Sequence, residues 1–175
     1  MPASGWRAGM SLKESPPPPA CRSYYCSPIG TIEIIGNEQG LLALGFVPKE
    51  PPASLPASPA WKRAVQELDE YFRGKRTKFS LGLVLQGTEF QIEVWRRLLE
   101  IPYGETVSYS QVAEAMGRPK AVRAVGMANA VNKIGIVIPC HRVIGRDGGL
   151  TGYGGGLWRK EWLLAHERKY AKGVR

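Results

Sequence analysis

The sequence predicts an α+β protein in which a small N-terminal α/β domain precedes a mainly α-helical C-terminal domain. Short β-type runs surround one helical stripe before residue 87, whereas helix-capping patterns recur after it. The length fits, because 175 residues with 43% hydrophobic content can form one ordinary core or two small ones. We therefore expect domains at 22–86 and 87–168 and a basic tail at 169–175. Residues 1–21, with four consecutive prolines, are expected to be a disordered leader.

The N-terminal domain is expected to begin with a β-hairpin or meander. Its three β-type runs are Tyr24–Cys26, Thr31–Ile35 and Leu41–Val47, with a turn at Gly36–Gly40. A helix should follow Ser58-Pro59, an N-cap with proline at the first helical position. Its buried stripe consists of Trp61, Val65, Leu68 and Phe72, and Gly74 ends it. Lys78–Leu85 is interpreted as one more strand.

Two capping boxes mark the first helices of the C-terminal domain. Thr88–Gln91 starts a helix that stops before Pro102, and Ser108–Gln111 starts a shorter helix that stops at Gly117. A third helix, from Ala121 to about Ala130, is rich in small residues. Two short helices joined by a tight turn predict a helix-turn-helix, whose second helix can approach DNA closely. The alternative is tight helix–helix packing inside the protein.

The run Ile136–Ile138 is interpreted as a short buried strand that Pro139 ends. Cys140 and His141 follow at once, so a candidate nucleophile and a candidate base lie at the edge of the core. Adjacent side chains of an extended segment point to opposite faces, so the imidazole would reach the sulfur around a turn or through a water. The alternative is that Cys140 is a small buried hydrophobic residue. A glycine-rich loop and an amphipathic helix at Leu157–Glu167 complete the domain.

Charge and cysteine content limit the class of protein. The 24 Lys and Arg against 15 Asp and Glu give a net charge of +9, which favours a polyanionic partner, nucleic acid first, over a merely solvated basic surface. Three cysteines suggest reduced thiols rather than a disulfide scaffold. Cys21 and Cys26 lie far in sequence from His141 and His166, so no metal site is expected. Without a transmembrane or signal segment, we expect a soluble intracellular protein.

The motif Pro139-Cys140-His141-Arg142-Val143, preceded by Arg123-Ala124-Val125-Gly126 and Asn132, resembles the O6-alkylguanine-DNA alkyltransferases. The resemblance extends from about Thr88 to Glu167, and Gly152-Tyr153 with Lys160–Leu164 look like the bacterial stand-alone type. It implies a ribonuclease-H-like N-terminal domain, and Tyr24–Leu85 is compatible with one. Lys133 and Gly135 stand where many members have proline, which removes no functional atom.

The resemblance implies DNA repair by irreversible, single-turnover transfer of the alkyl group of O6-alkylguanine to Cys140. His141 would act as base through a water, Glu167 would orient the imidazole, and Asn132 would brace the turn before the acceptor segment. Tyr109 would donate a proton or hydrogen bond to the purine. The implied substrate pocket comprises Pro139, Val143, Tyr153 and Gly154. No cofactor and no metal are implied.

The family extrudes the damaged nucleotide through the minor groove, and Arg123 would fill the gap in the base stack. The implied DNA-contacting residues are Ser108, Tyr109, Arg123, Ala124 and Gly126. Without the resemblance, a phosphate contact for Arg123 and a core position for Tyr109 would be favoured. The partner would be double-stranded DNA containing O6-alkylguanine, bound by a monomer in the cytoplasm, or at the nucleoid of a prokaryote.

Two other classes of function compete with this interpretation. A DNA-binding regulator or lesion-binding protein would use the same helix-turn-helix without chemistry, but alkyltransferase-like binders lack the acceptor cysteine. A Cys-His hydrolase would need an oxyanion hole and a base that reaches the sulfur directly, which adjacent Cys140 and His141 do not readily provide.

Overall fold

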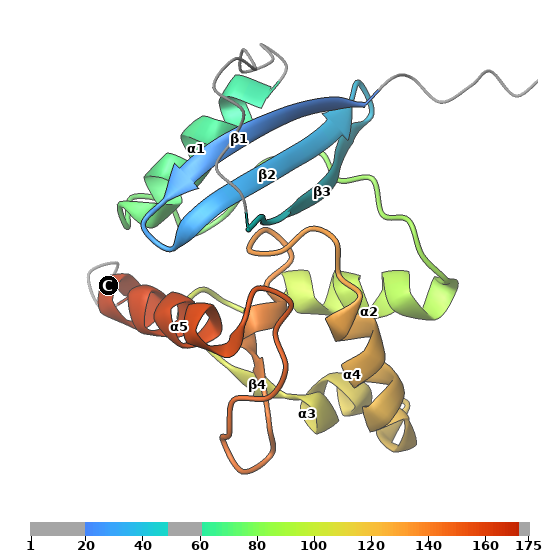
Figure 1. Cartoon of the computed structure of the whole chain (residues 1–175). Coiled ribbons are helices and arrows are strands. Elements are labelled where there is room, and N and C mark those ends of the chain that lie inside the picture. Colours follow the sequence, from blue (N-terminus) through green and yellow to red (C-terminus); the bar gives the residue numbers. More distant parts are fainter. Residues whose placement is uncertain (1–19, 49–60, 172–175) are drawn as a thin grey trace, which may run out of the picture.

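A computed structural model of the chain describes residues 20–48 and 61–171. An N-terminal unit of one sheet and one helix lies against a C-terminal unit made mostly of helices (Figure 1). Both units contribute to one connected hydrophobic core, which includes Ile34 and Leu68 from the first and Leu98 and Ile138 from the second. The predicted α+β architecture is thereby confirmed.

The predicted meander forms an antiparallel sheet with the order β1-β2-β3. The strands are β1 (Cys21–Ser27), β2 (Gly30–Asn37) and β3 (Gly40–Phe46). Alternate residues of β2 are buried, as expected for a sheet with one covered face. Both hairpin turns place a glycine in the left-handed region, with φ of 119° at Gly30 and 143° at Gly40. Because β1 begins at Cys21, the end of the predicted leader belongs to the sheet.

The helix of the N-terminal unit is α1 (Lys62–Phe72), which packs against β1 and ends near Gly74 at φ 70°. The predicted cap at Ser58-Pro59 lies outside the described residues. The strand predicted at Lys78–Leu85 is wrong, because only Leu83 forms a bridge, with Leu41 of β3. The physical reason lies in Ser80, whose N–H and hydroxyl both donate to the buried carboxylate of Glu67 instead of joining a sheet.

Both predicted capping boxes are present in the C-terminal unit. Thr88 caps α2 (Glu89–Leu99), and Ser108 caps α3 (Tyr109–Ala115), each with the expected reciprocal glutamine bond. Gly117 turns the chain at φ 69°, and a 3-10 turn η2 (Pro119–Ala121) leads into α4 (Val122–Ala130). That these two helices bind DNA as a helix-turn-helix stays a prediction. A short parallel pair, β4 (Val107–Ser108) with β5 (Val143–Ile144), was not predicted.

The strand predicted at Ile136–Ile138 is also wrong. The segment forms tight turns, and Ile136 takes φ 67°, a strained value for a β-branched residue. Its N–H groups bond locally, from Val137 to Gly135 and from Ile138 to Ile134, instead of to a neighbouring strand. The three apolar side chains are nevertheless buried, which is what their composition required. Cys140 therefore does not end a strand but starts the 3-10 helix η3 (Cys140–Arg142).

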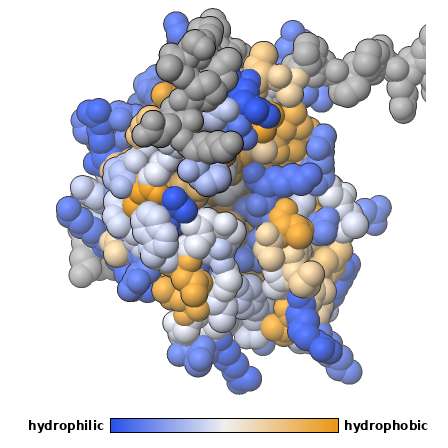
Figure 2. All heavy atoms as spheres, viewed as in Figure 1, coloured by the Kyte–Doolittle hydropathy of each residue, from blue (hydrophilic) through white to orange (hydrophobic). Residues whose placement is uncertain are grey.

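The last helix, α5 (Leu157–Ala171), continues beyond the predicted boundary at residue 168 and contacts η3. Its buried residues include the charged Lys160 and Glu167. Hydrophobic residues form several separate patches among hydrophilic ones on the face shown in Figure 2. Within residues 20–48 and 61–171, no helix combines the length and apolar character that crossing a membrane requires.

Candidate active site

Cys140 lies at the N-terminus of η3 with 6% of its surface exposed. Two asparagines hold the backbone around it. The Asn129 amide donates to the Cys140 carbonyl at 3.4 Å, and the Asn132 amide donates to the Ile138 carbonyl at 3.0 Å. Asn132 also accepts from the N–H of Ile134 at 3.0 Å, so this one side chain fixes both ends of the turn. These bonds are compatible with the expected brace, and the role of Asn132 stays a prediction.

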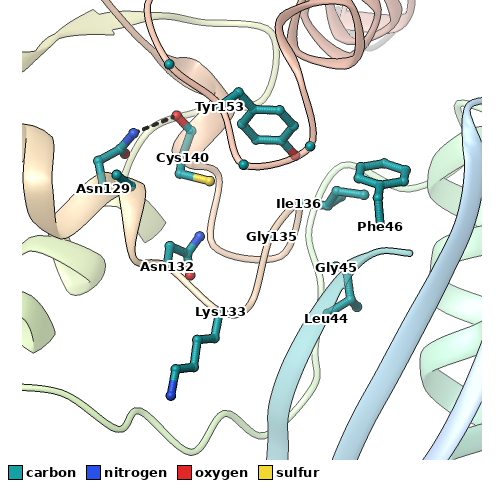
Figure 3. A pocket seen from close by; sticks show the side chains of 14 residues that line it. Leu44, Gly45, Phe46, Asn129, Asn132, Lys133, Gly135, Ile136, Cys140 and Tyr153 are labelled. Carbon is teal, nitrogen blue, oxygen red and sulfur yellow. Dashed lines mark hydrogen bonds between the residues drawn. The ribbon is translucent and has the colours of Figure 1, made fainter. Parts of the chain in front are cut away.

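The Cys140 side chain faces a pocket of about 310 Å³ (Figure 3). The sulfur lies with Asn132 on one side and the ring of Tyr153 on the other. One wall comes from the N-terminal unit, where β3 contributes Phe46 and its two preceding residues. The complete lining is Leu44, Gly45, Phe46, Asn129, Ala130, Asn132, Lys133, Gly135, Ile136, Cys140, Gly152, Tyr153, Gly154 and Gly155.

His141 forms a buried pair with Glu167. Its Nε2 lies 2.9 Å from Oε1 of Glu167, and both side chains are fully buried. A carboxylate accepts hydrogen bonds, so Nε2 carries the proton and Nδ1 is the basic atom. Among the described residues, Nδ1 is buried and has no hydrogen-bond partner. Within the described part of the chain the lone pair of Nδ1 is therefore free, which is compatible with the expected role of His141 as a base.

Glu167 is the centre of the hydrogen-bond network behind Cys140. Its Oε1 accepts from Tyr71 (2.8 Å), His141 (2.9 Å) and Nη2 of Arg142 (2.9 Å). Its Oε2 accepts from Nε of Arg142 (2.8 Å) and from the N–H of Gly104 (3.0 Å). Five donors satisfy the carboxylate, and Arg142 also donates to the Ile101 carbonyl. A buried charge with this many partners is tolerated without neutralisation.

Burial and these contacts set the protonation of the three groups. Burial raises the pKa of the Cys140 thiol, although the Asn132 amide and the Lys160 charge oppose it. Burial also lowers the pKa of His141 below its usual range, in spite of Glu167. Burial alone would raise the pKa of Glu167, but the hydrogen bonds and charges of His141 and Arg142 outweigh it and lower this pKa. Near neutral pH the site holds a thiol, a neutral imidazole and a carboxylate.

Lys160 joins the two segments that enclose the pocket from the α5 side. Its Nζ donates to the carbonyls of Val143 at 2.6 Å and Thr151 at 2.7 Å. Burial lowers the pKa of Lys160 to about 8, although the electrostatic interaction with Cys140 opposes this shift. Among residues 20–48 and 61–171, no group of three potential ligands for a metal ion occurs.

The structure brings some of the expected site residues together and separates others. Cys140, Asn132, Tyr153 and Gly154 line the pocket, and the His141–Glu167 pair lies behind it. Pro139 and Val143 are buried but do not line this pocket. The Val143 N–H donates to the Cys140 carbonyl.

The expected DNA-contacting residues gather on α3 and α4. Arg123 and Ala124 are exposed near the start of α4, and Ser108 caps α3. Gly126 lies beside Tyr109, and a Cβ there would meet the tyrosine ring at 3.9 Å, an ordinary van der Waals contact. The Tyr109 hydroxyl accepts from Thr151 at 3.1 Å, and its own proton is left available.

Sequence reasoning missed the roles of Tyr71, Arg142 and Lys160. Two of these residues carried a signal, because Arg142 stands inside the apolar run from Ile136 to Ile144 and Lys160 falls on the buried side of α5. A charged residue at a buried position needs a partner, so each should have been treated as a candidate member of the site. Tyr71 carried no such signal, because a tyrosine on a buried stripe is ordinary.

Two family profiles match the chain. The 6-O-methylguanine DNA methyltransferase ribonuclease-like domain matches residues 21–85, and the DNA binding domain of the same family matches residues 89–169. The methylated-DNA–protein-cysteine methyltransferase of Methanosarcina barkeri is 49% identical over 81% of this chain and 92% of its own length. That of Mycolicibacterium paratuberculosis is 51% identical over 83% and 90%.

Solved structures agree with this result. The crystal structure of the Mycobacterium tuberculosis O6-methylguanine methyltransferase has a TM-score of 0.76 and 45% identity, covering 86% of this chain and 94% of that one. A further structure holds the Mycobacterium tuberculosis protein in complex with DNA. The fold, the cysteine site and both domain matches lead to one conclusion: the chain belongs to the 6-O-methylguanine DNA methyltransferase family.

Proposed function

We propose that this protein repairs DNA by moving the alkyl group of O6-alkylguanine onto Cys140, once per molecule. The observation that carries the proposal is a buried thiol in a pocket of about 310 Å³, next in sequence to a histidine whose basic atom is free. The chain binds DNA and is a methyltransferase of the repair family to which it belongs. The regulator alternative is not favoured, because a protein that only binds DNA needs neither the buried thiol nor the neighbouring basic nitrogen.

The reaction begins with proton transfer. The Cys140 thiol is protonated near neutral pH, so its proton must leave as the sulfur attacks. His141 accepts that proton at Nδ1 through a water, because a side chain adjacent in sequence does not reach the sulfur directly. Glu167 keeps Nε2 protonated and stabilises the imidazolium that forms.

The alkyl transfer is a displacement at carbon. The sulfur forms a bond to the alkyl carbon while the bond from that carbon to O6 breaks, and the electron pair passes to the guanine. The guanine then takes one proton, which Tyr109 can donate because its hydroxyl only accepts from Thr151. The product is an uncharged thioether with no leaving group at hand, so the thiol does not re-form and each molecule reacts once.

DNA recognition is assigned to α3 and α4. Arg123 is exposed near the start of α4, where a long cation can enter the minor groove and fill the place of an extruded nucleotide. The small residues Ala124 and Gly126 let this helix approach the duplex. The net charge of +9 supplies attraction to phosphates. We propose that the protein works as a monomer, at the DNA in the cytoplasm or nucleoid.

Duplex DNA carrying O6-[methyl-³H]guanine tests the proposal. The label should move to protein with a stoichiometry of one per chain, and Cys140→Ser should abolish transfer while DNA binding persists. A regulator or lesion binder would take no label, and a hydrolase would release it without covalent transfer. Label found on Cys21 or Cys26 would show that Cys140 is not the acceptor.

A further inference from the structure

The N-terminal unit sends one polar side chain into the catalytic network. Tyr71, on α1, is fully buried, and its hydroxyl donates to Oε1 of Glu167 at 2.8 Å. This is the same oxygen that accepts from Nε2 of His141 at 2.9 Å. A residue of the N-terminal unit therefore donates to the same carboxylate oxygen that orients His141.

The phenol of Tyr71 has a fixed position. Its ring packs edge-on against Phe72 at 5.3 Å and Tyr103 at 6.0 Å between centroids. Its backbone carbonyl lies 2.8 Å from Nε2 of His166, which precedes Glu167 on α5. Burial and Glu167 raise the pKa of Tyr71 well above its usual value, so the phenol remains a donor at every working pH. The contact is rigid on both sides.

We propose that Tyr71 is a positioning residue for alkyl transfer: its phenol holds Oε1 of Glu167 where that oxygen orients His141, so the ribonuclease-like unit completes the catalytic network. The inference deepens the proposed function and rests on it. Tyr71 touches neither substrate nor sulfur and acts through Glu167.

The charged and titratable groups around His141 and Glu167 decide how the loss of the Tyr71 hydroxyl should change the pH dependence of the transfer rate. Glu167 faces His141 and Arg142 from η3, Tyr71 from α1 and Tyr103 from the loop after α2. His141 faces Glu167, Arg142, Lys160 from α5, and the ring of Tyr153 at 6.4 Å. His166 of α5 also faces Glu167, and Lys169 faces His166. Tyr71 is the neutral donor that shares Oε1 with the imidazole.

Removing that donor has two consequences. Oε1 of Glu167 keeps its bonds from His141 and Arg142 but loses its third donor, so the imidazole is less often aligned and the maximal transfer rate falls by about tenfold, the value of one hydrogen bond to a charged group. The remaining negative charge on Oε1 acts more strongly on His141, which favours the imidazolium. The pH below which the base is lost should therefore rise.

The experiment is a pH–rate profile for Tyr71→Phe, with single-turnover transfer from free O6-benzylguanine, which needs no DNA. The expected result is a plateau about tenfold lower and an acidic limb moved to higher pH. Tyr25→Phe is the matched control, because it removes a phenol hydroxyl of the same unit that donates to Asp69 and not to Glu167. It should leave the profile unchanged. All rates are taken well below each variant's measured Tm.

A double-mutant cycle separates positioning from packing. In a His141→Gln background the base is absent, so adding Tyr71→Phe should change the residual rate less than twofold. A Tyr71→Phe profile that coincides with the wild type, or an equal loss in both backgrounds, would overturn the proposal. Absence of any transfer by the wild-type chain would instead refute the proposed function.

Discussion

Glu167→Gln tests the buried network at its centre. The carboxylate accepts five hydrogen bonds, and Arg142 donates to both of its oxygens. An amide carries one oxygen and one NH₂ group, so either orientation sets an NH₂ against an Arg142 donor. The guanidinium is then left buried without a counter-charge. Breaking a buried pair in this way costs about 3–5 kcal/mol of the free energy of unfolding.

The loss of unfolding free energy in Glu167→Gln should be smaller at acidic pH than at neutral pH. The pKa of Glu167 is lower in the folded chain than in the unfolded one, so its contribution is complete above the unfolded pKa of about 4.3 and declines as pH falls toward the folded pKa. At pH 3 the difference between wild type and variant should be smaller than at pH 7 by about 1.8 kcal/mol. Acid thus removes the advantage of the carboxylate.

Urea unfolding at pH 7 and pH 3 measures both quantities. Glu114→Gln is the matched control, because Glu114 is exposed on α3, and it should stay within about 0.5 kcal/mol of the wild type at both pH values. A Glu167→Gln variant as stable as this control at pH 7 would refute the description of Glu167 as a buried, fully paired charge. A difference that did not shrink at pH 3 would refute its low folded pKa.

Three more predictions concern DNA and the helices that meet it. Arg123→Ala should keep near-normal transfer from free O6-benzylguanine but react far more slowly with the lesion in saturating duplex, since unstacking a base costs a few kcal/mol. An unchanged rate at saturating duplex would show that Arg123 takes no part in extruding the nucleotide. Duplex affinity should fall steeply between 50 and 200 mM salt and depend little on sequence, as titration by fluorescence anisotropy would show. Ser108→Ala should cost about 1 kcal/mol in urea unfolding, because its hydroxyl caps α3 at 3.1 Å, and a loss below about 0.3 kcal/mol would count against the cap.

Local signals were sufficient to predict much of the fold. Three helix boundaries each depend on residues within one helical turn, and all are present in the structure: the capping boxes at Thr88 and Ser108 and the C-terminal glycine Gly117. The three-strand meander is equally local, because glycines at its turns fix the register. Such elements need no knowledge of distant partners.

Apolar runs were misassigned where the partner was distant. Ile136–Ile138 is as buried as a central strand, yet Asn132 closes it into turns, and composition alone does not separate the two outcomes. The strand predicted at Lys78–Leu85 is absent for a similar reason, because the carboxylate of Glu67 accepts a hydrogen bond from the backbone N–H of Ser80. In both cases a side chain satisfied groups that a sheet would otherwise have paired.

The candidate site shows the same difference between residues that are close in sequence and residues that are far apart. Cys140, His141 and Asn132 lie within ten positions of one another, so the motif alone was enough to predict them as candidates. Tyr71 lies 96 positions from Glu167, and no periodicity links the two residues. The contact exists only because α1 and α5 pack together, which a single sequence does not reveal.

The segment that leads to Cys140 has an irregular backbone, and the thiol of Cys140 is nearly buried. Both properties have the same cause. A regular strand would pair its backbone groups with a neighbouring strand but would point alternate side chains to opposite faces. Here side chains satisfy the backbone: Asn132 bonds the Ile138 carbonyl, and Lys160 bonds the carbonyls of Val143 and Thr151. The chain can therefore turn sharply before Cys140 and still bury its polar groups. The thiol is held in its pocket by residues that do not react, so a substitution among them should lower the transfer rate while leaving the sulfur itself intact.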